Sequence, residues 1–129
     1  MSLLGRKRKN GQPDPEFSEL ELARHRQILD PYMEKKRPPA QIRDKMDIAY
    51  RIEGQSVEIF VIREWYMDRT KKIEQPSAKA TYVKDRDFWQ VSWQRADLRW
   101  YPYDADPEVP SLKGFTKIVD ADKYGCFWG

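Results

Sequence analysis

The chain has 129 residues, of which 40% are hydrophobic, 35% are charged and 13% are aromatic. This length suits one domain, and the aromatic content predicts a packed core rather than a disordered chain. The single cysteine, Cys126, excludes an internal disulfide framework. No apolar run approaches the roughly 18 residues that cross a bilayer, and no secretory signal is seen. We therefore expect a cytoplasmic protein with no membrane partner.

The net charge of +3 is unevenly distributed along the chain. Residues 1–16 hold four consecutive basic residues, Arg6–Lys9, against Asp14 and Glu16, which leaves the rest of the chain close to neutral. Glycines and prolines oppose regular structure in this stretch. Residues 1–16 are therefore predicted to be a flexible basic leader, and residues 17–129 a single domain. Because phosphate binding needs concentrated positive charge, nucleic acid is a weakly supported partner.

The first predicted element is a helix that begins after Ser18. Ser18 and Glu21 have the spacing of a capping box, in which each side chain accepts a hydrogen bond from the other residue's backbone N–H. An apolar stripe at roughly helical spacing follows; it comprises Leu22, Ile28, Leu29, Tyr32 and Met33. Pro31 predicts a kink or a break, because proline removes a helical hydrogen bond, and Pro38-Pro39 ends the element.

Five strands are predicted next, because the hydrophobic period changes from helical spacing to alternation after Arg43. They are Met46–Ile52, Val57–Trp65, Ala78–Val83, Phe88–Gln94 and Leu98–Tyr103. Residues 53–56 predict a hairpin turn, and the polar residues 67–76 predict a loop. The second strand is apolar on both faces, so it is predicted to be central and covered on both. Pro102 predicts that the fifth strand lies at an edge.

The chain is predicted to close with a short helix for which Ser111 is the N-cap. Its apolar face comprises Leu112, Phe115, Ile118 and Val119, and residues 124–129 are predicted to dock on the body as a small apolar tail. Together these elements predict an α+β fold. An antiparallel meander of about five strands carries an N-terminal helix and a short C-terminal helix packed on the sheet.

Several separate sequence blocks, in one order, carry a family resemblance. They are Arg37-Pro38-Pro39, Ile42-Arg43-Asp44, Tyr50–Val57, Ala78–Val83, Trp93–Trp100 and Tyr124–Gly129. Over about residues 17–129 the chain resembles a family of small bacterial proteins, domain of unknown function 3024. The resemblance itself implies no activity. Where the family pattern has a histidine, after the second tryptophan of the Trp93–Trp100 block, this chain has Tyr101, so an activity that needs this histidine would not carry over.

Residues suited to nucleophilic catalysis are few. His25 and Cys126 are the only histidine and the only cysteine, and nothing in the sequence brings them together as a reactive pair. Cys126 is predicted to be buried with a raised pKa, because its neighbours are apolar, whereas His25, between two arginines, is predicted to be solvated. The chain lacks the glycine-rich phosphate-binding motifs, and we expect no cofactor.

A metal site would depend on carboxylates, because one histidine and one cysteine exclude ordinary zinc sites. Asp47, Glu58 and Lys79 lie on three predicted strands, and they would serve a metal-dependent hydrolase if they converged. However, Asp47 and Glu58 fall on the polar phase of their strands, where carboxylates are usually only solvated. The hydrolase is therefore one of two alternatives to the function favoured below.

The stretch Trp89–Tyr103 is the candidate binding surface, because aromatic residues alternate there with polar and charged ones. Strand phase assigns Trp89 and Trp93 to the core. The residues predicted to reach a ligand or partner are Arg95, Arg99, Trp100, Tyr101 and Tyr103. Arginines beside sheet aromatics can hold phosphates while the rings stack on bases or another planar ligand.

The favoured hypothesis is a non-enzymatic binding or interaction module that uses this aromatic/arginine sheet surface. A protein partner or a second copy at a sheet edge fits it. The other alternative is a nucleic-acid-associated protein that uses the basic leader with Arg95 and Arg99. A simpler interpretation of the turn is an ion pair between Arg95 and Asp97.

Overall fold

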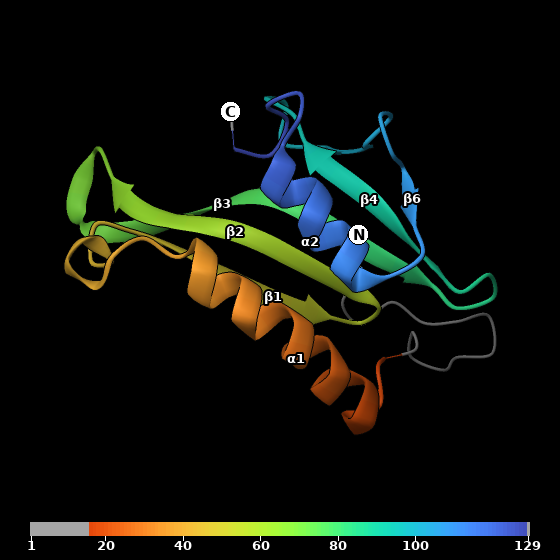
Figure 1. Cartoon of the computed structure of the whole chain (residues 1–129). Helices are drawn as coiled ribbons and strands as arrows, with labels where there is room; N and C mark the ends of the chain where they lie inside the picture. Colours follow the sequence, from red (N-terminus) through yellow and green to blue (C-terminus); the bar gives the residue numbers. More distant parts are fainter. Residues whose placement is uncertain (1–15, 129) are drawn as a thin grey trace, which may run out of the picture.

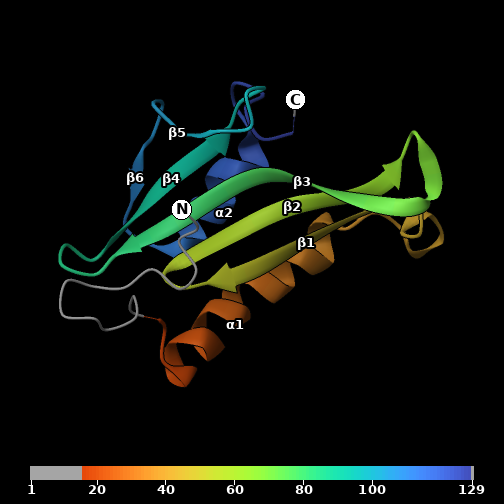
Figure 2. The same cartoon turned by 180° about the vertical axis from the view of Figure 1, so that it is seen from behind.

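The computed structural model describes residues 16–128, so the predicted leader lies, apart from Glu16, outside the described residues. In chain order the elements are α1 (Glu19–Lys36), the 3-10 turn η1 (Ala40–Ile42), β1 (Met46–Glu53), β2 (Ser56–Trp65), β3 (Asp68–Val83), β4 (Phe88–Gln94), β5 (Trp100–Pro102), β6 (Glu108–Val109) and α2 (Leu112–Ala121). The sheet has the order β1-β2-β3-β4-β5, with antiparallel neighbours, and β6 also pairs with β4. Both helices lie on one face of this sheet (Figures 1 and 2). The predicted α+β fold is confirmed.

Helix α1 begins at the predicted capping box. The Glu21 N–H donates to Ser18 Oγ at 3.1 Å, and the Ser18 N–H donates to Glu21 Oε1 at 2.8 Å. The break predicted at Pro31 is not found, because the helix is continuous to Lys36. Pro31 lies on the exposed side of the helix. The packing of the buried side chains on the opposite side, from Leu29 to Met33, offsets the single hydrogen bond that proline removes.

The hydrophobic core lies between the two helices and the face of the sheet that they cover. Alternate residues of the strands point to this face, which we call the covered face. The largest fully buried side chains are Val57 and Ile59 of β2, Val91 of β4, Leu29 of α1, and Phe115 and Val119 of α2. At least one of them comes from each helix and from each of two central strands, so the core joins segments that are distant in sequence.

Strands β2 and β3 form a long hairpin, and this corrects the loop predicted for residues 67–76. Residues 68–76 belong to β3 and pair with the distal half of β2. The register shifts where Ile59 pairs with Ala78 but Phe60 pairs with Pro76, which leaves Ser77 as an extra residue in a bulge. A proline at a bulge needs no ladder hydrogen bond, and these polar side chains need no core. Residues 68–76 therefore pair as a strand although their sequence shows no hydrophobic alternation.

The opposite face of the sheet, which we call the open face, carries no described helix (Figure 2). The predicted central position of β2 is confirmed, and helices cover one of its two faces (Figure 2). Phe60 is nevertheless only 5% exposed, because the Arg51 guanidinium lies 4.1 Å from the centre of its ring. Arg51 also forms ion pairs with Glu58, at 3.2 Å, and with Glu74. Side chains of the sheet itself thus cover Phe60.

The last strands share one edge of β4. Strand β5 pairs with residues 92–94 and β6 with residues 89–90, so the predicted edge position of Pro102 is confirmed. Between them, the Tyr103 N–H donates to the Val91 carbonyl at 2.9 Å, and the Val91 N–H donates to the Pro107 carbonyl at 2.9 Å. The chain therefore follows the same edge from Trp100 to Val109.

The closing helix and tail are found as predicted. Ser111 caps α2 by accepting a hydrogen bond from the Gly114 N–H at 3.1 Å. Phe127 is buried, and Trp128 Nε1 donates to the Val119 carbonyl at 2.9 Å, which fixes the tail on α2. None of the helices within residues 16–128 has the length and apolarity to cross a membrane.

Candidate functional site

The turn between β4 and β5, residues 95–99, organises the candidate site. The Arg95 N–H donates to the Arg99 carbonyl at 3.1 Å, and the Leu98 N–H donates to the Arg95 carbonyl at 2.8 Å. Leu98 has a φ of 65° and is 75% exposed. Leu98 is unfavourable in two respects, because its backbone is left-handed and its apolar side chain faces water. The turn thus presents a strained, exposed apolar residue between two arginines.

Arg95 stacks on two aromatic rings that reach the turn from the neighbouring strands. Its guanidinium carbon lies 4.5 Å from the centre of the Tyr101 ring and 5.1 Å from that of Trp93. Trp93 and Tyr101 are register partners on β4 and β5, so both rings project to the covered face, beside one another. Among the described residues, none forms an ion pair with Arg95. The stack therefore orients the cation without neutralising it.

Asp97 fixes the other side of the turn. It accepts a hydrogen bond from the Tyr101 hydroxyl, and a second from the Arg99 N–H at 2.9 Å. The hydroxyl's bond, followed by the backbone bond, lowers the pKa of Asp97, and the same contact raises the pKa of Tyr101. Asp97 therefore stays ionised at neutral pH and holds the Tyr101 ring under Arg95. The ion pair predicted as the simpler interpretation is replaced by this three-residue arrangement.

Trp100 lies on the opposite side of the same strands. Successive residues of a strand point to opposite faces, so Trp100, next to Tyr101, projects to the open face. Lys79 Nζ lies 4.7 Å from the centre of its ring. The end of the sheet thus carries a cation–aromatic pair on each face. We call Trp93, Arg95, Asp97, Leu98, Arg99, Trp100 and Tyr101 the turn site.

The structure brings four of the five predicted site residues to this turn and corrects the fifth. Arg95 and Arg99 are exposed, and Trp100 and Tyr101 are half-buried. Tyr103 is only 4% exposed, because it packs in the core with its ring centre 4.8 Å from that of Phe127. Tyr103 is therefore a core residue that no partner can reach. Lys79 and Leu98 were not predicted, because their positions depend on strand register and on turn conformation.

The aromatic residues at the other end of β4 belong to the core. Trp89 is buried, as predicted, and packs with Phe17 and with His25 of α1. The prediction that His25 is solvated is wrong, since its ring lies edge-on to Phe17 at 4.4 Å between ring centres. Burial lowers the pKa of His25, and its Nε2 has no hydrogen-bond partner among the described residues. His25 is therefore a neutral packing residue.

His25 and Cys126 do not form a reactive pair. His25 packs against Trp89, whereas Cys126 lies near Arg95 and Tyr103, beyond the other end of β4. Trp89 and Trp93, at the two ends, are four residues apart, about 13 Å along a strand. Burial raises the pKa of the Cys126 thiol, and Asp122 raises it further. The thiol is half-buried and is not activated as a nucleophile.

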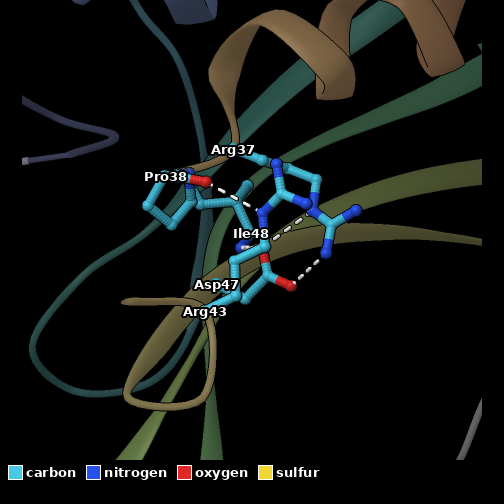
Figure 3. Close-up of polar contacts among 5 residues, drawn as sticks. All are labelled: Arg37, Pro38, Arg43, Asp47 and Ile48. Atoms are coloured by element: carbon cyan, nitrogen blue, oxygen red, sulfur yellow. Dashed lines mark hydrogen bonds and ion pairs between the residues drawn. The ribbon is translucent and has the colours of Figure 1, made fainter. Parts of the chain in front are cut away.

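The carboxylates considered for a metal site have other partners. Asp47 Oδ1 and Oδ2 accept hydrogen bonds from Arg37 Nε and Nη2 at 2.9 and 2.6 Å, and Oδ1 also accepts the Ile48 N–H (Figure 3). Arg43 Nε donates to the Pro38 carbonyl beside this pair. The hydrogen bond from Arg37 is the main cause that lowers the pKa of Asp47. This contact ties the end of α1 to the start of β1.

Glu58 is not close enough to Asp47 to share an ion with it. Glu58 pairs in register with Arg51 and with Lys79, whereas Asp47 is four positions from Arg51 along β1, about 13 Å. Within residues 16–128, no three acidic, histidine or cysteine side chains are grouped to hold a metal ion. The geometry therefore gives no support to the metal-dependent hydrolase.

The structure defines an α+β protein whose described helices lie on one face of an antiparallel sheet. The family model for a domain of unknown function, DUF3024, matches residues 17–129, and the chain belongs to this family. The predicted resemblance is confirmed, and the family description assigns no activity. No curated protein and no solved structure matches the chain.

Proposed function

We propose that this protein is a non-enzymatic binding module whose turn site takes an anionic group on a planar or apolar ligand. The observation that carries the proposal is the Arg95 stack. The Arg95 guanidinium lies 4.5 Å from the centre of the Tyr101 ring and 5.1 Å from that of Trp93. A guanidinium is planar and carries several N–H donors, which suits it to bind carboxylate and phosphate groups.

The rest of the turn site supports an apolar contribution to binding. Leu98 is exposed at the tip, and the half-buried ring of Trp100 lies on the other face with Lys79 above it. Half-buried aromatic rings bind planar groups with little loss of side-chain entropy. A partner that carries both an anion and a planar group is therefore favoured over a simple ion.

The same proposal includes the setting in which the module works. We propose that residues 17–129 act as one domain in the cytoplasm of a bacterium. The single cysteine, in a half-buried and unactivated position, is compatible with a reducing compartment.

The test is NMR titration of the indole N–H signals with adenosine monophosphate, ribose 5-phosphate and adenosine as three separate probes. We expect the monophosphate to shift the signals of Trp93 and Trp100 more than either fragment does, because only it carries both groups. Arg95→Gln is expected to weaken binding at least about tenfold through the lost charge-assisted hydrogen bonds.

Arg86→Gln is the matched control, because Arg86 also stacks on an aromatic ring of β4, that of Phe88, at the opposite end of the strand. The control variant should bind as the original chain does. Absence of a saturable shift with every probe up to millimolar concentration would overturn the anion specificity, and equal loss in the two variants would remove the turn site from the proposal.

A further inference from the structure

The distal part of the β2–β3 hairpin, residues 62–74, extends past the end of α1 (Figures 1 and 2). We call it the hairpin arm. Strand β1 begins opposite Arg63, because its first residue, Met46, pairs with Arg63 of β2. On the other side, β4 pairs with β3 only from Ala78 onward. Glu64 still donates its N–H to the Lys45 carbonyl of the segment before β1. Beyond Glu64 no third strand of the described residues pairs with the arm, and the side of β3 that would face β4 has no neighbouring strand there.

The tip of the arm exposes large apolar side chains. Tyr66 is 85% exposed and Met67 is 65% exposed. The turn behind them is well ordered by Asp68, whose Oδ1 accepts hydrogen bonds from the Thr70 N–H at 3.1 Å and from Thr70 Oγ1 at 2.7 Å. The exposure of Tyr66 and Met67 is therefore a property of a defined turn, and such exposed apolar residues mark interaction sites.

Positive charge surrounds this tip. The exposed cations of the arm are Arg63, Arg69, Lys71 and Lys72. The exposed Lys45 joins them, because its carbonyl accepts a hydrogen bond from the Glu64 N–H at 3.2 Å. Among residues 16–128 none of these five cations forms an ion pair. The acidic residues of the arm are Glu64, Asp68 and Glu74. Asp68 is engaged by Thr70, and Glu74 forms an ion pair with Arg51.

We infer that the hairpin arm binds double-stranded nucleic acid. A two-stranded β-ribbon fits the major groove of B-form DNA, which is about 12 Å wide, because paired strands lie only about 4.8 Å apart. The cations then contact phosphates on both walls of the groove, and Tyr66 and Met67 supply apolar contacts at the end of the ribbon. In the major groove, apolar side chains can contact the methyl group of thymine.

The placement of the cations favours a duplex over a membrane surface. Arg63 follows Val61 on the covered-face side of β2, whereas Lys72 pairs with Glu64 on the open-face side. Cations on both faces of a ribbon match two rows of phosphates. A membrane-binding hairpin would instead place its cations around one apolar face.

The edge chemistry opposes a second copy as the occupant. Lys71, Lys72 and Pro76 lie on the part of β3 that has no neighbouring strand on one side. Lysine and proline at an exposed edge prevent strand addition, because one repels a like edge and the other lacks an N–H donor. Addition of a second copy at this edge of the arm is therefore disfavoured.

The test is fluorescence anisotropy of a labelled 24-base-pair DNA duplex of mixed sequence with the full chain at 50 to 200 mM NaCl. With one phosphate contact for each of the five cations, affinity should fall about 500-fold over this range, since each contact contributes about 0.9 to the slope of log K against log salt. The variant Arg69→Gln/Lys71→Gln/Lys72→Gln should lose most of the salt dependence, leaving about a twelvefold change.

The matched control is Lys113→Gln/Lys117→Gln/Lys123→Gln, which removes the same charge from exposed positions on and after α2. It should keep the original salt dependence. Tyr66→Ala/Met67→Ala should weaken duplex binding by about tenfold with an unchanged slope, because it removes apolar contacts only. Thermal unfolding of every variant is the check that the fold is retained.

Four results would overturn the inference. The first is no duplex binding at 50 mM NaCl, and the second is an equal loss of affinity in the triple variant of the arm and the triple control variant. The third is tighter binding to the single strand of the same sequence. The fourth is binding to vesicles of phosphatidylcholine and phosphatidylglycerol without binding to the duplex. The inference is independent of the turn site, so Arg95→Gln should leave duplex binding intact.

Discussion

The two faces of the sheet bury aromatic side chains by different means. On the covered face, Phe115 of α2 is completely buried between a helix and the strands. On the open face, Phe60 is almost as well buried, and the Arg51 side chain of the neighbouring strand lies over its ring. The first kind of burial needs a second layer of structure, and the second needs only a neighbouring strand. The difference shows how the sheet buries Phe60 on the face that carries no described helix.

Phe115→Ala is the substitution with the largest expected effect, and it tests burial on the covered face. The helix and the strands around this side chain hold one another in place, so the cavity can collapse only in part. We expect a loss of about 3–5 kcal/mol in the free energy of unfolding, measured by urea denaturation. A loss below about 1 kcal/mol would show that α2 is not firmly packed on the sheet.

Phe60→Ala should have a smaller effect, about 2 kcal/mol, although the two side chains are similarly buried. The Arg51 side chain can move into the vacated space, which reduces the residual cavity. A double-mutant cycle with Arg51→Ala should give a coupling energy of about 1 kcal/mol for the stacked pair. Two results would contradict this expectation. One is a loss in the free energy of unfolding for Phe60→Ala as large as that for Phe115→Ala, and the other is a cycle without coupling between Phe60 and Arg51.

Asp47→Ala tests the ion pair that connects the end of α1 to the open face, and we expect a loss of about 1 kcal/mol at pH 7. The pKa of Asp47 is lowered in the folded state, so its stabilising effect is present above its unfolded pKa, near 4. The effect is lost as the pH falls through the lower folded value. Urea denaturation at pH 7 and at pH 2.5 should show the difference between variant and original chain shrinking; a constant difference would contradict the ionic origin.

Elements with local signals were predictable from the sequence. The capping box of Ser18 and Glu21 fixes where α1 begins. The alternation of Trp89, Val91 and Trp93 along β4 places these three side chains on the covered face. Each signal involves residues within a few positions of one another. Interactions between residues that are close in sequence can be recognised without knowledge of the fold.

The errors arise where distant segments decide the outcome. Tyr103 is buried because Phe127 returns to pack on it, 24 residues later in the chain. Residues 68–76 form a strand because β2 supplies their hydrogen bonds, not because of their own side chains. At the turn site, the residue types were predictable, but the stack of Arg95 on Tyr101 requires the register of β4 with β5.

The length of β3 has a geometric consequence for the whole molecule. Its 16 residues extend about 50 Å at the rise of a strand, whereas the 18 residues of α1 span about 27 Å at the rise of a helix. A helix would need more than 30 residues to match that reach. A sheet with so long a strand must therefore extend beyond helices of ordinary size. In this protein the extending part is the hairpin arm, whose tip lies far from the centre of the molecule.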